Sequence, residues 1–214
     1  MNYRNMFDSQ TDRRWDEISQ KLFETCIEHG LHPNMKLLDV GCGPLRVGIK
    51  LIDYLNTGNY YGIDANANHL DIGLNIEVPN YNLKEKIVIE NFTITDKFDI
   101  EHYKTCFDMI LVSGVFTHLT LNHFMLFMEQ IKNSTKKGSK IITTFWICDE
   151  EHDITKPIEI KFNDYKKVIL NHTSDPYFYK LSQIKNVVDN NLWEIYVYNE
   201  KDFKQSLLVF ERKQ

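Results

Sequence analysis

Residues 37–48 read LLDVGCGPLRVG, an apolar run that is followed directly by a glycine-rich turn. Gly41 and Gly43 carry no side chain, so the backbone there can approach a bound ligand closely. A helix predicted over about 45–55 would offer the free N–H groups of its first turn to the same ligand. The stretch therefore predicts a strand, a nucleotide-binding turn and a helix, although glycines at this spacing also form ordinary tight turns.

Two carboxylates sharpen this interpretation. Asp39 precedes the first glycine by two positions, where it would disfavour an anionic pyrophosphate and favour a ligand with ammonium and sulfonium groups. Asp64 ends a second predicted strand, where it can accept hydrogen bonds from both hydroxyls of a ribose. Its alternative role is to cap the helix predicted over 66–76. The next glycine after Gly43 is Gly48, which departs from the dinucleotide fingerprint.

The rest of the chain alternates strand-like and helix-like stretches. Further strands are predicted within 87–95 and at 107–112, 140–147, 192–198 and 205–211, and further helices at 11–29, 121–132 and 180–190. This alternation indicates a parallel α/β sheet with an antiparallel hairpin at the C-terminal end. Residues 149–178 are polar and look irregular, and we expect them to form an inserted lid or acceptor-side loop. Ligands of such sheets bind beyond the carboxyl ends of the strands.

Length and composition fit one domain over 1–214, with an N-terminal helical cap over 1–32. The chain has 214 residues, of which 43% are hydrophobic, and its net charge is −5. With a pI near 5.9 it has no general attraction for nucleic acid or an anionic membrane. The four cysteines lack zinc or redox spacing, and no apolar signal segment opens the chain. We therefore expect a cytoplasmic protein with reduced thiols.

Here the sequence resembles the class I S-adenosylmethionine-dependent methyltransferases. The resemblance rests on Leu38–Gly43 as the first motif, Gly62–Asp64 as the second, Phe107–Leu119 as the fourth-strand motif, Lys137–Thr143 as the turn into the fifth strand, and Gln205–Phe210 as the final strand. The opening segment is similar to a bacterial subset whose first motif reads Gly-Cys-Gly-x-Leu-Arg. Some relatives in that subset modify sugars or glycan precursors.

The resemblance implies a Rossmann-like three-layer α/β sandwich. Its sheet would have seven mostly parallel strands in the order 3-2-1-4-5-7-6, with an antiparallel C-terminal strand. It also implies S-adenosylmethionine as cofactor, with Asp39 on the methionine part and Asp64 on the ribose. An acidic residue about a dozen positions before the Phe-Asp of the fourth strand usually binds the adenine amino group, which points to Asp96, with Asn91 as the alternative. Ser113 and Gly114 would lie under the methionine. The expected cofactor-binding residues are Asp39, Gly41, Cys42, Gly43, Asp64, Ala65, Asp96, Lys97, Phe98, Ser113, Gly114 and Val115.

Candidates for the acceptor side are less constrained by the sequence. An oxygen acceptor needs a base, and His118, after the fourth strand, is the first candidate; it could equally pack at a helix start. Arg46 could face an anionic acceptor or pair with Asp16 or Glu17. Tyr177 and Tyr179 could wall an acceptor pocket or pack within the insertion. Residues 149–152 read DEEH, which we interpret as a solvated loop, so no metal is expected.

These features together predict a methyltransferase that acts on an oxygen of a small polar acceptor, such as a sugar, a glycan precursor or another metabolite. The loop over 113–116 is not the Asp/Asn-Pro-Pro-Tyr of nucleic-acid amino-methyltransferases, and no Pro-Cys pair exists for cytosine chemistry. No nucleic-acid or membrane partner is therefore expected, and the protein would be a monomer or a homodimer. An NAD(P)-dependent oxidoreductase and a non-catalytic S-adenosylmethionine-binding protein are the alternatives.

Overall fold

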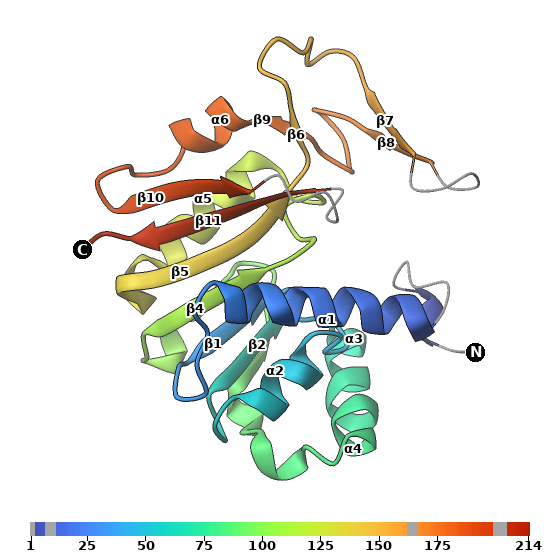
Figure 1. The fold of residues 1–214 in the computed structure, drawn as a ribbon, viewed down its shortest axis with the longest axis vertical. Helices are drawn as coiled ribbons and strands as arrows, with labels where there is room; N and C mark the ends of the chain where they lie inside the picture. The colour runs from blue at the N-terminus through green and yellow to red at the C-terminus, as the bar shows by residue number, and fades with distance from the viewer. Residues whose placement is uncertain (1–2, 7–11, 162–166, 199–204) are drawn as a thin grey trace. The chain divides into compact units, whose positions relative to one another are not determined.

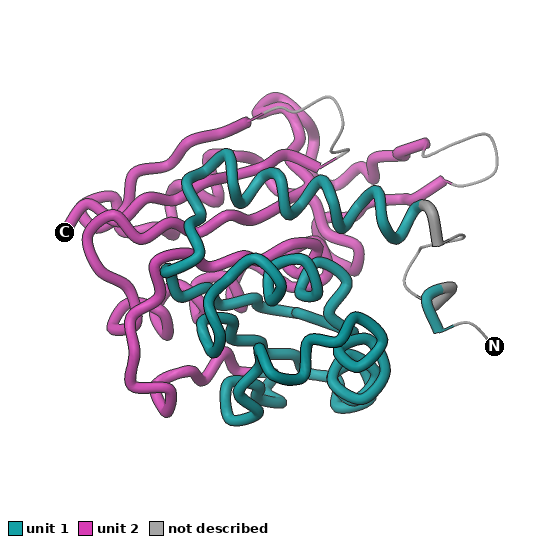
Figure 2. Tube along the Cα trace, turned by 60° about the horizontal axis from the view of Figure 1, so that its bottom comes forward, with its two compact units in different colours: residues 1–96 teal, residues 97–214 magenta. Residues whose placement is uncertain are grey.

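The protein is described by a computed structural model, which covers residues 3–6, 12–161, 167–198 and 205–214. The chain divides into two compact units, residues 1–96 and residues 97–214 (Figure 2). The prediction of a single domain over the whole chain stays a prediction.

The first unit contains three parallel strands. They are β1 (Leu37–Val40), β2 (Tyr60–Asp64) and β3 (Phe92–Ile94), with β2 between the other two (Figure 1). Every residue of β1 and β2 is buried, as the continuous apolar runs predict for strands of a parallel sheet. The order β3-β2-β1 agrees with the first part of the predicted strand order.

The helices of this unit are α1 (Asp12–Glu28), α2 (Gly48–Tyr54), α3 (Ala67–Ile72) and α4 (Val78–Asn80), with a π-helical turn over Gly73–Glu77 and 3-10 turns at Tyr3–Met6, Lys84–Lys86 and Ile89–Asn91. The helix predicted from residue 45 begins only at Gly48. The reason is local, because Gly43 and Leu45 have left-handed φ angles of +54° and +62° that keep the chain in a turn. Arg46 therefore lies in this turn and not in the first turn of the helix.

The second unit contains the other four strands of the predicted order. They are β4 (Phe107–Val112), β5 (Thr135–Phe145), β10 (Trp193–Tyr198) and β11 (Ser206–Arg212). β4 pairs with β5 in parallel, and β11 pairs antiparallel with both β5 and β10. The order β4-β5-β11-β10 agrees with 4-5-7-6, and the predicted antiparallel C-terminal strand is confirmed.

Helices α5 (Leu121–Gln130) and α6 (Leu181–Asn186) complete this unit, with 3-10 turns at Glu101–Tyr103 and Lys132–Ser134. Its core is aromatic. Phe116 is fully buried and packs against Phe124, Phe127 and Phe145 at ring distances of 5.0–5.4 Å. β5 begins at Thr135, five positions earlier than predicted.

The prediction that residues 149–178 are irregular is wrong in part. β7 (Ile158–Lys161) and β8 (Lys167–Leu170) form an antiparallel pair, and β9 (Tyr179–Lys180) pairs in parallel with β6 (Ile147–Cys148) (Figure 1). The physical reason is a small apolar cluster formed by Trp146, Leu170 and Phe178, against which apolar residues of β7 and β8 pack. Among the described residues, no helix combines the length and the apolar character needed to cross a bilayer.

Candidate cofactor and acceptor sites

The glycine turn of the first unit is closed by the carboxylate of Asp64. Its Oδ2 accepts a hydrogen bond from the Gly43 amide at 2.8 Å, and its Oδ1 accepts one from the Asn66 amide at 2.8 Å. Each carboxylate oxygen has two lone-pair sites, so Oδ2 keeps one for a further donor, while Nδ1 of His69 lies 3.6 Å from Oδ1. Asp64 is 9% exposed.

The three successive amides of the turn are all engaged within the chain. The amides of Gly41 and Cys42 donate to the carbonyl oxygen of Ile63 at 2.8 and 3.1 Å, and the Gly43 amide donates to Asp64. None of the three can hold a phosphate without giving up its partner. The turn therefore offers carboxylates, and not these amides, to a ligand. That set suits hydroxyl donors and cations.

Asp39 lies deeper than Asp64, with an exposed fraction of only 3%. Its Oδ2 accepts a hydrogen bond of 2.7 Å from the hydroxyl of Tyr60. Burial raises the pKa of Asp39 to about 7, against the opposing effect of the Tyr60 hydrogen bond; the charge of Asp64 adds to the rise and that of Arg46 reduces it. Gly48 makes this pairing possible, because a Cβ there would lie 2.6 Å from the Tyr60 hydroxyl. A positively charged ligand group near Asp39 would favour its ionised form.

The two candidates for the adenine lie in different surroundings. Asp96 is exposed and follows β3 by two residues, and Ala65 is also exposed. Asn91 is 8% exposed, and its amide nitrogen donates to the carbonyl oxygens of Gly58 and Tyr60 at 2.9 and 3.2 Å. These hydrogen bonds give Asn91 a structural role, and the assignment of Asp96 to the adenine stays a prediction.

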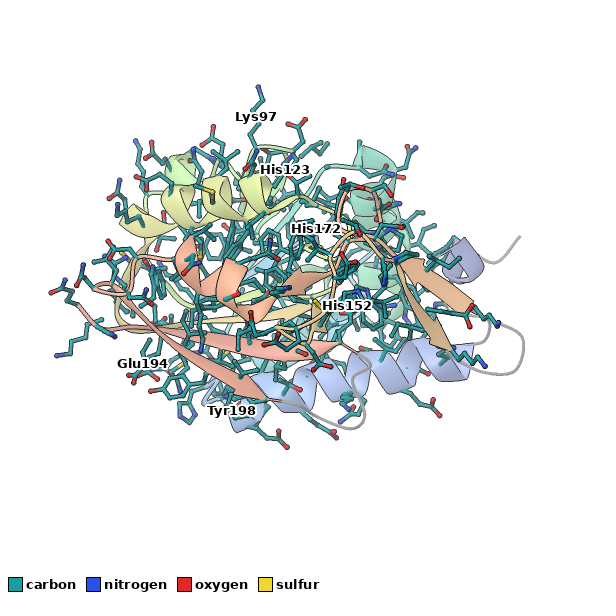
Figure 3. The ribbon with its side chains drawn as sticks, turned by 90° about the horizontal axis from the view of Figure 1, so that it is seen from above. Lys97, His123, His152, His172, Glu194 and Tyr198 are labelled. Atoms are coloured by element: carbon teal, nitrogen blue, oxygen red, sulfur yellow. The ribbon has the colours of Figure 1, made fainter. Side chains whose placement is uncertain are left out.

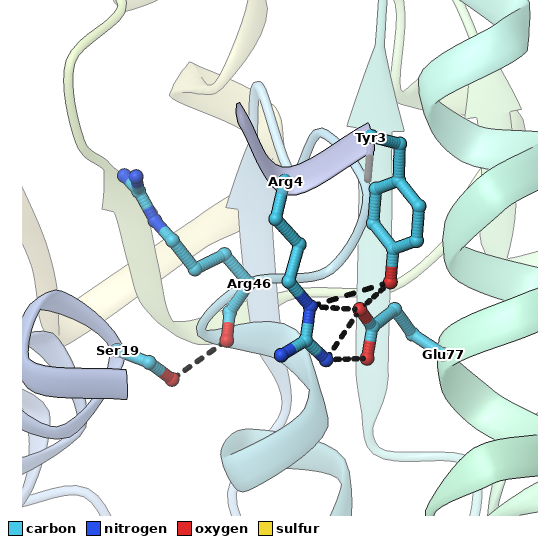
Figure 4. A network of polar contacts seen from close by, with 5 residues as sticks. All are labelled: Tyr3, Arg4, Ser19, Arg46 and Glu77. Atoms are coloured by element: carbon cyan, nitrogen blue, oxygen red, sulfur yellow. Dashed lines mark hydrogen bonds and ion pairs between the residues drawn. The ribbon is translucent and has the colours of Figure 1, made fainter. Parts of the chain in front are cut away.

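Arg46 and Trp15 meet in the first unit. The Arg46 guanidinium lies 5.6 Å from the centroid of the Trp15 ring, and the Arg4 guanidinium lies 5.3 Å from it. The hydroxyl of Ser19 donates to the Arg46 carbonyl oxygen at 2.6 Å, which ties α1 to the glycine turn (Figure 4). Trp15 is 3% exposed and anchors its helix. The distance to Trp15 is within the range of a cation–π contact.

In the second unit, the turn after β4 has a fixed backbone. The Gly114 amide donates to the Thr144 hydroxyl at 2.9 Å, and the Thr117 hydroxyl donates to the Gly114 carbonyl oxygen at 3.1 Å. Ser113, Gly114 and Val115 are all partly exposed. Phe98 is buried and its ring lies 5.5 Å from that of Phe127, whereas Lys97 is exposed on the surface (Figure 3).

His118 follows this turn, and its ring is exposed. Its Nδ1 lies 2.6 Å from Oδ1 of Asp175, a residue that sequence reasoning missed. Fifty-seven positions separate the two, so no motif or helical spacing could have paired them. The pair brings a possible proton acceptor and a carboxylate together on one surface.

Tyr177 and Tyr179 differ in their surroundings. Tyr179 is 3% exposed, and its hydroxyl donates to the Leu119 carbonyl oxygen at 2.9 Å. Tyr177 is partly exposed, stacks on Tyr179 with ring centroids 6.2 Å apart, and bonds to Thr117 through its backbone amide at 2.8 Å. Tyr179 is thus buried and Tyr177 is partly exposed, and the assignment of either ring to an acceptor pocket stays a prediction.

Glu150 and His152, two residues of the run over 149–152, contact other residues of the second unit. Both carboxylate oxygens of Glu150 accept from Ser182, at 2.9 and 2.6 Å. The rings of His152 and His172 lie 5.3 and 5.9 Å from the ring of Phe178. Within the described ranges, no three metal-binding side chains are grouped as a metal ion would require.

Comparison with known proteins identifies the family. The model of a methyltransferase-domain family matches residues 31–200. Among solved structures, an S-adenosylmethionine-dependent methyltransferase from Clostridium acetobutylicum is 13% identical, with a TM-score of 0.65, over 99% of this chain and 96% of that one. Magnesium protoporphyrin IX methyltransferase from Synechocystis, solved with bound SAM, is 12% identical, with a TM-score of 0.63, over 92% and 79%. A putative rRNA methylase from Clostridium thermocellum is 8% identical, with a TM-score of 0.61, over 91% and 95%.

The chain belongs to the methyltransferase-domain family, because the family model covers well over half of it. The likeness to the solved structures shows the fold, which confirms the predicted Rossmann-like α/β class with seven strands. Two of these neighbours are named for different acceptors, magnesium protoporphyrin IX and rRNA.

Proposed function

We propose that this protein is an S-adenosylmethionine-dependent methyltransferase that methylates an oxygen of a small polar acceptor, such as a sugar or a glycan precursor. The hydrogen bonding of the glycine turn is the observation that carries the cofactor assignment. Its three amides are engaged within the chain, and the groups left to a ligand are the carboxylates of Asp39 and Asp64. This set favours a ligand with an ammonium group and ribose hydroxyls over a dinucleotide pyrophosphate.

The residues of the first unit fit such a ligand. The free lone pairs of Asp64 suit the ribose hydroxyls, and Asp96, exposed after β3, suits the adenine amino group. Asp39 would favour the ammonium group of the methionine part by its charge. When bound, S-adenosylmethionine supplies a methyl carbon already activated by a sulfonium. The protein then has to supply alignment and the exclusion of water.

On the second unit, His118 is the proposed general base. Its ring is exposed, and a hydroxyl acceptor must lose its proton during transfer. Tyr177 is proposed as a wall of the acceptor pocket, and Arg46 of the first unit as a contact for an anionic acceptor group. Contacts of the cofactor with Cys42, Ala65, Lys97, Phe98 and the turn over 113–115 stay predictions.

A small acceptor is favoured over RNA by charge. The chain carries a net charge of −5, and RNA-binding proteins gain most of their affinity from cationic contacts with phosphates. Methyl transfer from S-adenosylmethionine is the reaction with a small acceptor and with RNA. The identity of the acceptor therefore needs a direct test.

Titration of the purified protein by calorimetry, with S-adenosylhomocysteine in one experiment and NADH in another, tests the cofactor. We expect binding of the first and none of the second; the reverse would show a dinucleotide site. Transfer of radioactive methyl groups from S-adenosylmethionine to a panel of sugars and nucleotide sugars, and to total RNA, tests the acceptor. Methylation of RNA alone would overturn the small-acceptor assignment, and binding without transfer to any acceptor would favour a non-catalytic protein.

The role of His118 is tested with the first acceptor found. His118→Gln should lower turnover about 10²–10⁴-fold and leave the affinity for S-adenosylhomocysteine unchanged. His123→Gln is the matched control, because that ring accepts or donates locally to the Thr120 hydroxyl at 2.8 Å. If His118→Gln keeps most of its turnover when chemistry limits the rate, the base is another group or none is needed.

A further inference from the structure

The ring of His118 and the carboxylate of Asp175 form a short, exposed pair. The Nδ1–Oδ1 distance is 2.6 Å, and the two side chains are 62% and 58% exposed. Exposed pairs of this kind contribute about 0–1 kcal/mol to stability in other proteins. The contribution of this pair to stability is therefore expected to be small.

The backbone on the Asp175 side of the pair is held in place. The Tyr177 amide, two residues along the chain, donates to the Thr117 carbonyl oxygen at 2.8 Å. The neighbouring Phe178 is fully buried in the apolar cluster with Trp146. These contacts fix the segment that carries Asp175 against the turn that carries His118.

The backbone on the His118 side is held as well. The His118 amide donates to the Val115 carbonyl oxygen at 2.9 Å, and the preceding Thr117 bonds through its hydroxyl to Gly114. Both members of the pair therefore project from anchored backbone. The short distance between the two side chains thus rests on hydrogen-bonded backbone near both residues.

The contact selects one form of the neutral ring. A neutral imidazole carries its proton on one nitrogen only, and a carboxylate can only accept. A proton on Nδ1 satisfies Asp175 and leaves Nε2 unprotonated, whereas a proton on Nε2 would set the Nδ1 lone pair against the carboxylate. The pair thus aims an unprotonated Nε2 away from Asp175.

We infer that Asp175 is a positioning residue that keeps Nε2 of His118 ready to accept a proton, an inference that rests on the proposed function. During transfer, the acceptor oxygen forms its bond to the methyl carbon as the carbon–sulfur bond breaks, with that electron pair remaining on sulfur. The hydroxyl proton passes to Nε2 of His118. The resulting imidazolium is stabilised by the Asp175 carboxylate and later releases its proton to water. Asp175 itself acts only through His118.

The test is a spectroscopic measurement on the protein with no acceptor present. Nitrogen-15 NMR of the histidine rings, read at the alkaline plateau, reports which ring nitrogen carries the proton, and His118→Gln assigns the signals. We expect the Nδ1–H form in the wild type and a shift toward the Nε2–H form in Asp175→Ala. Asp175→Glu should restore the wild-type form in part. The control is Asp153→Ala, whose carboxylate accepts from the Thr155 amide and hydroxyl.

Kinetics and calorimetry separate this inference from the proposed function. With an acceptor in hand, Asp175→Ala should lower kcat about 10–100-fold, the scale seen when partners that orient a ligating histidine are lost, and leave KM nearly unchanged. The same ring form in the wild type and Asp175→Ala would overturn the inference, even where S-adenosylhomocysteine binds normally. A wild type that does not bind S-adenosylhomocysteine would instead overturn the proposed function.

Discussion

The amide of Gly43 donates a hydrogen bond of 2.8 Å to Oδ2 of Asp64. The carboxylate proposed to receive the ribose thus also shapes the turn on which the cofactor would lie. Because the same carboxylate performs both tasks, a substitution at Asp64 should lower the affinity for the cofactor in two ways. It removes contacts with the ribose, and it changes the geometry of the turn. A carboxylate held by two amides is also already oriented before any ligand arrives.

Replacement of Asp64 tests the ribose assignment. Asp64→Asn removes the charge and one acceptor oxygen, so we expect S-adenosylhomocysteine to bind more weakly by about 1.5–3 kcal/mol, the range for charge-assisted hydrogen bonds. Calorimetry measures the loss, and circular dichroism checks that the variant folds. Asp53→Asn, an exposed change on α2, is the matched control. Equal affinity in a folded Asp64→Asn protein would remove Asp64 from the ribose site.

Asp39 should make the protein less stable at alkaline pH. The pKa of its carboxyl rises from the ordinary 3.8 to about 7 in the folded state, so the folded protein binds the proton more tightly than the unfolded chain. The free energy of unfolding therefore falls as pH rises between these two values. Asp39→Asn keeps an oxygen for the Tyr60 hydroxyl and removes the buried charge. Near pH 8 it should be more stable than the wild type, by at most about 4 kcal/mol.

Urea unfolding at several pH values measures this difference, which should shrink toward about pH 4, where the wild-type carboxyl is protonated in the folded state. The same variant should bind S-adenosylhomocysteine more weakly, because the charge that favours the ammonium group is gone. Wild-type affinity should rise as pH passes through about 7. A stability difference that does not change with pH would contradict the buried, ionisable state of Asp39.

Asp96 can be tested with a ligand that lacks the adenine amino group. S-inosylhomocysteine carries an oxygen at that position, so it cannot donate to a carboxylate. Asp96→Ala should weaken binding of S-adenosylhomocysteine by about 1–3 kcal/mol and change binding of the inosine analogue much less. Asp99→Ala, a nearby exposed aspartate, is the control. An equal loss for both ligands would mean that Asp96 acts on the fold and not on the amino group.

The fold was predictable where apolar runs are long and uninterrupted. β4 occupies Phe107–Val112 as expected, because six successive apolar or semi-buried positions have few alternatives. The β7–β8 pair was missed because its strands alternate buried or partly buried with exposed positions inside a polar stretch, whereas β1, which is equally short, is buried throughout. Its stability comes from packing on Trp146 and Phe178, which no local pattern records.

Candidate site residues could be predicted where they lie near the carboxyl ends of strands. Asp39 and Asp64 could be named as candidates because a carboxylate near a strand end beside a glycine turn has a limited set of uses, and their cofactor contacts stay predictions. Asp175 was missed because its partner, His118, lies 57 positions away. The contact between His118 and Asp175 arises from tertiary packing, and no sequence pattern between the two residues indicates it.

Removing the hydroxyls of the two stacked tyrosines should give different results. Burial raises the pKa of Tyr179, and its hydroxyl is bonded to the Leu119 carbonyl oxygen, so Tyr179→Phe should lower stability by about 0.5–1.5 kcal/mol. Tyr177 bonds to Thr117 through its backbone, so Tyr177→Phe should unfold like the wild type. If Tyr177 walls the acceptor pocket, this variant should raise the KM for the acceptor. If Tyr177→Phe changes the stability and not the KM, the Tyr177 hydroxyl serves the fold and not the acceptor pocket.

The last prediction concerns Arg4 and Glu77, which join the N-terminal segment to the π-helical turn. The Arg4 guanidinium lies 2.9 and 3.0 Å from the two oxygens of Glu77, which also accepts from the Tyr3 hydroxyl (Figure 4). The Glu77 side chain is 1% exposed, and burial raises its pKa to about 7. Arg4→Gln leaves this carboxylate without its cation. Because Arg4 is 17% exposed, we expect a loss of about 3 kcal/mol near pH 8, the lower end for a broken buried pair.

The loss should depend on pH in one direction. Below about pH 7 Glu77 can take up a proton, and a neutral carboxyl needs no cation, so Arg4→Gln should approach wild-type stability as pH falls toward about 5. The double variant Arg4→Gln with Glu77→Gln buries no charge, and near pH 8 it should be more stable than Arg4→Gln alone. Urea unfolding of the wild type, of the single variants Arg4→Gln and Glu77→Gln, and of the double variant completes a double-mutant cycle. If the single and double variants are equally stable near pH 8, Glu77 is not a buried charge that Arg4 compensates.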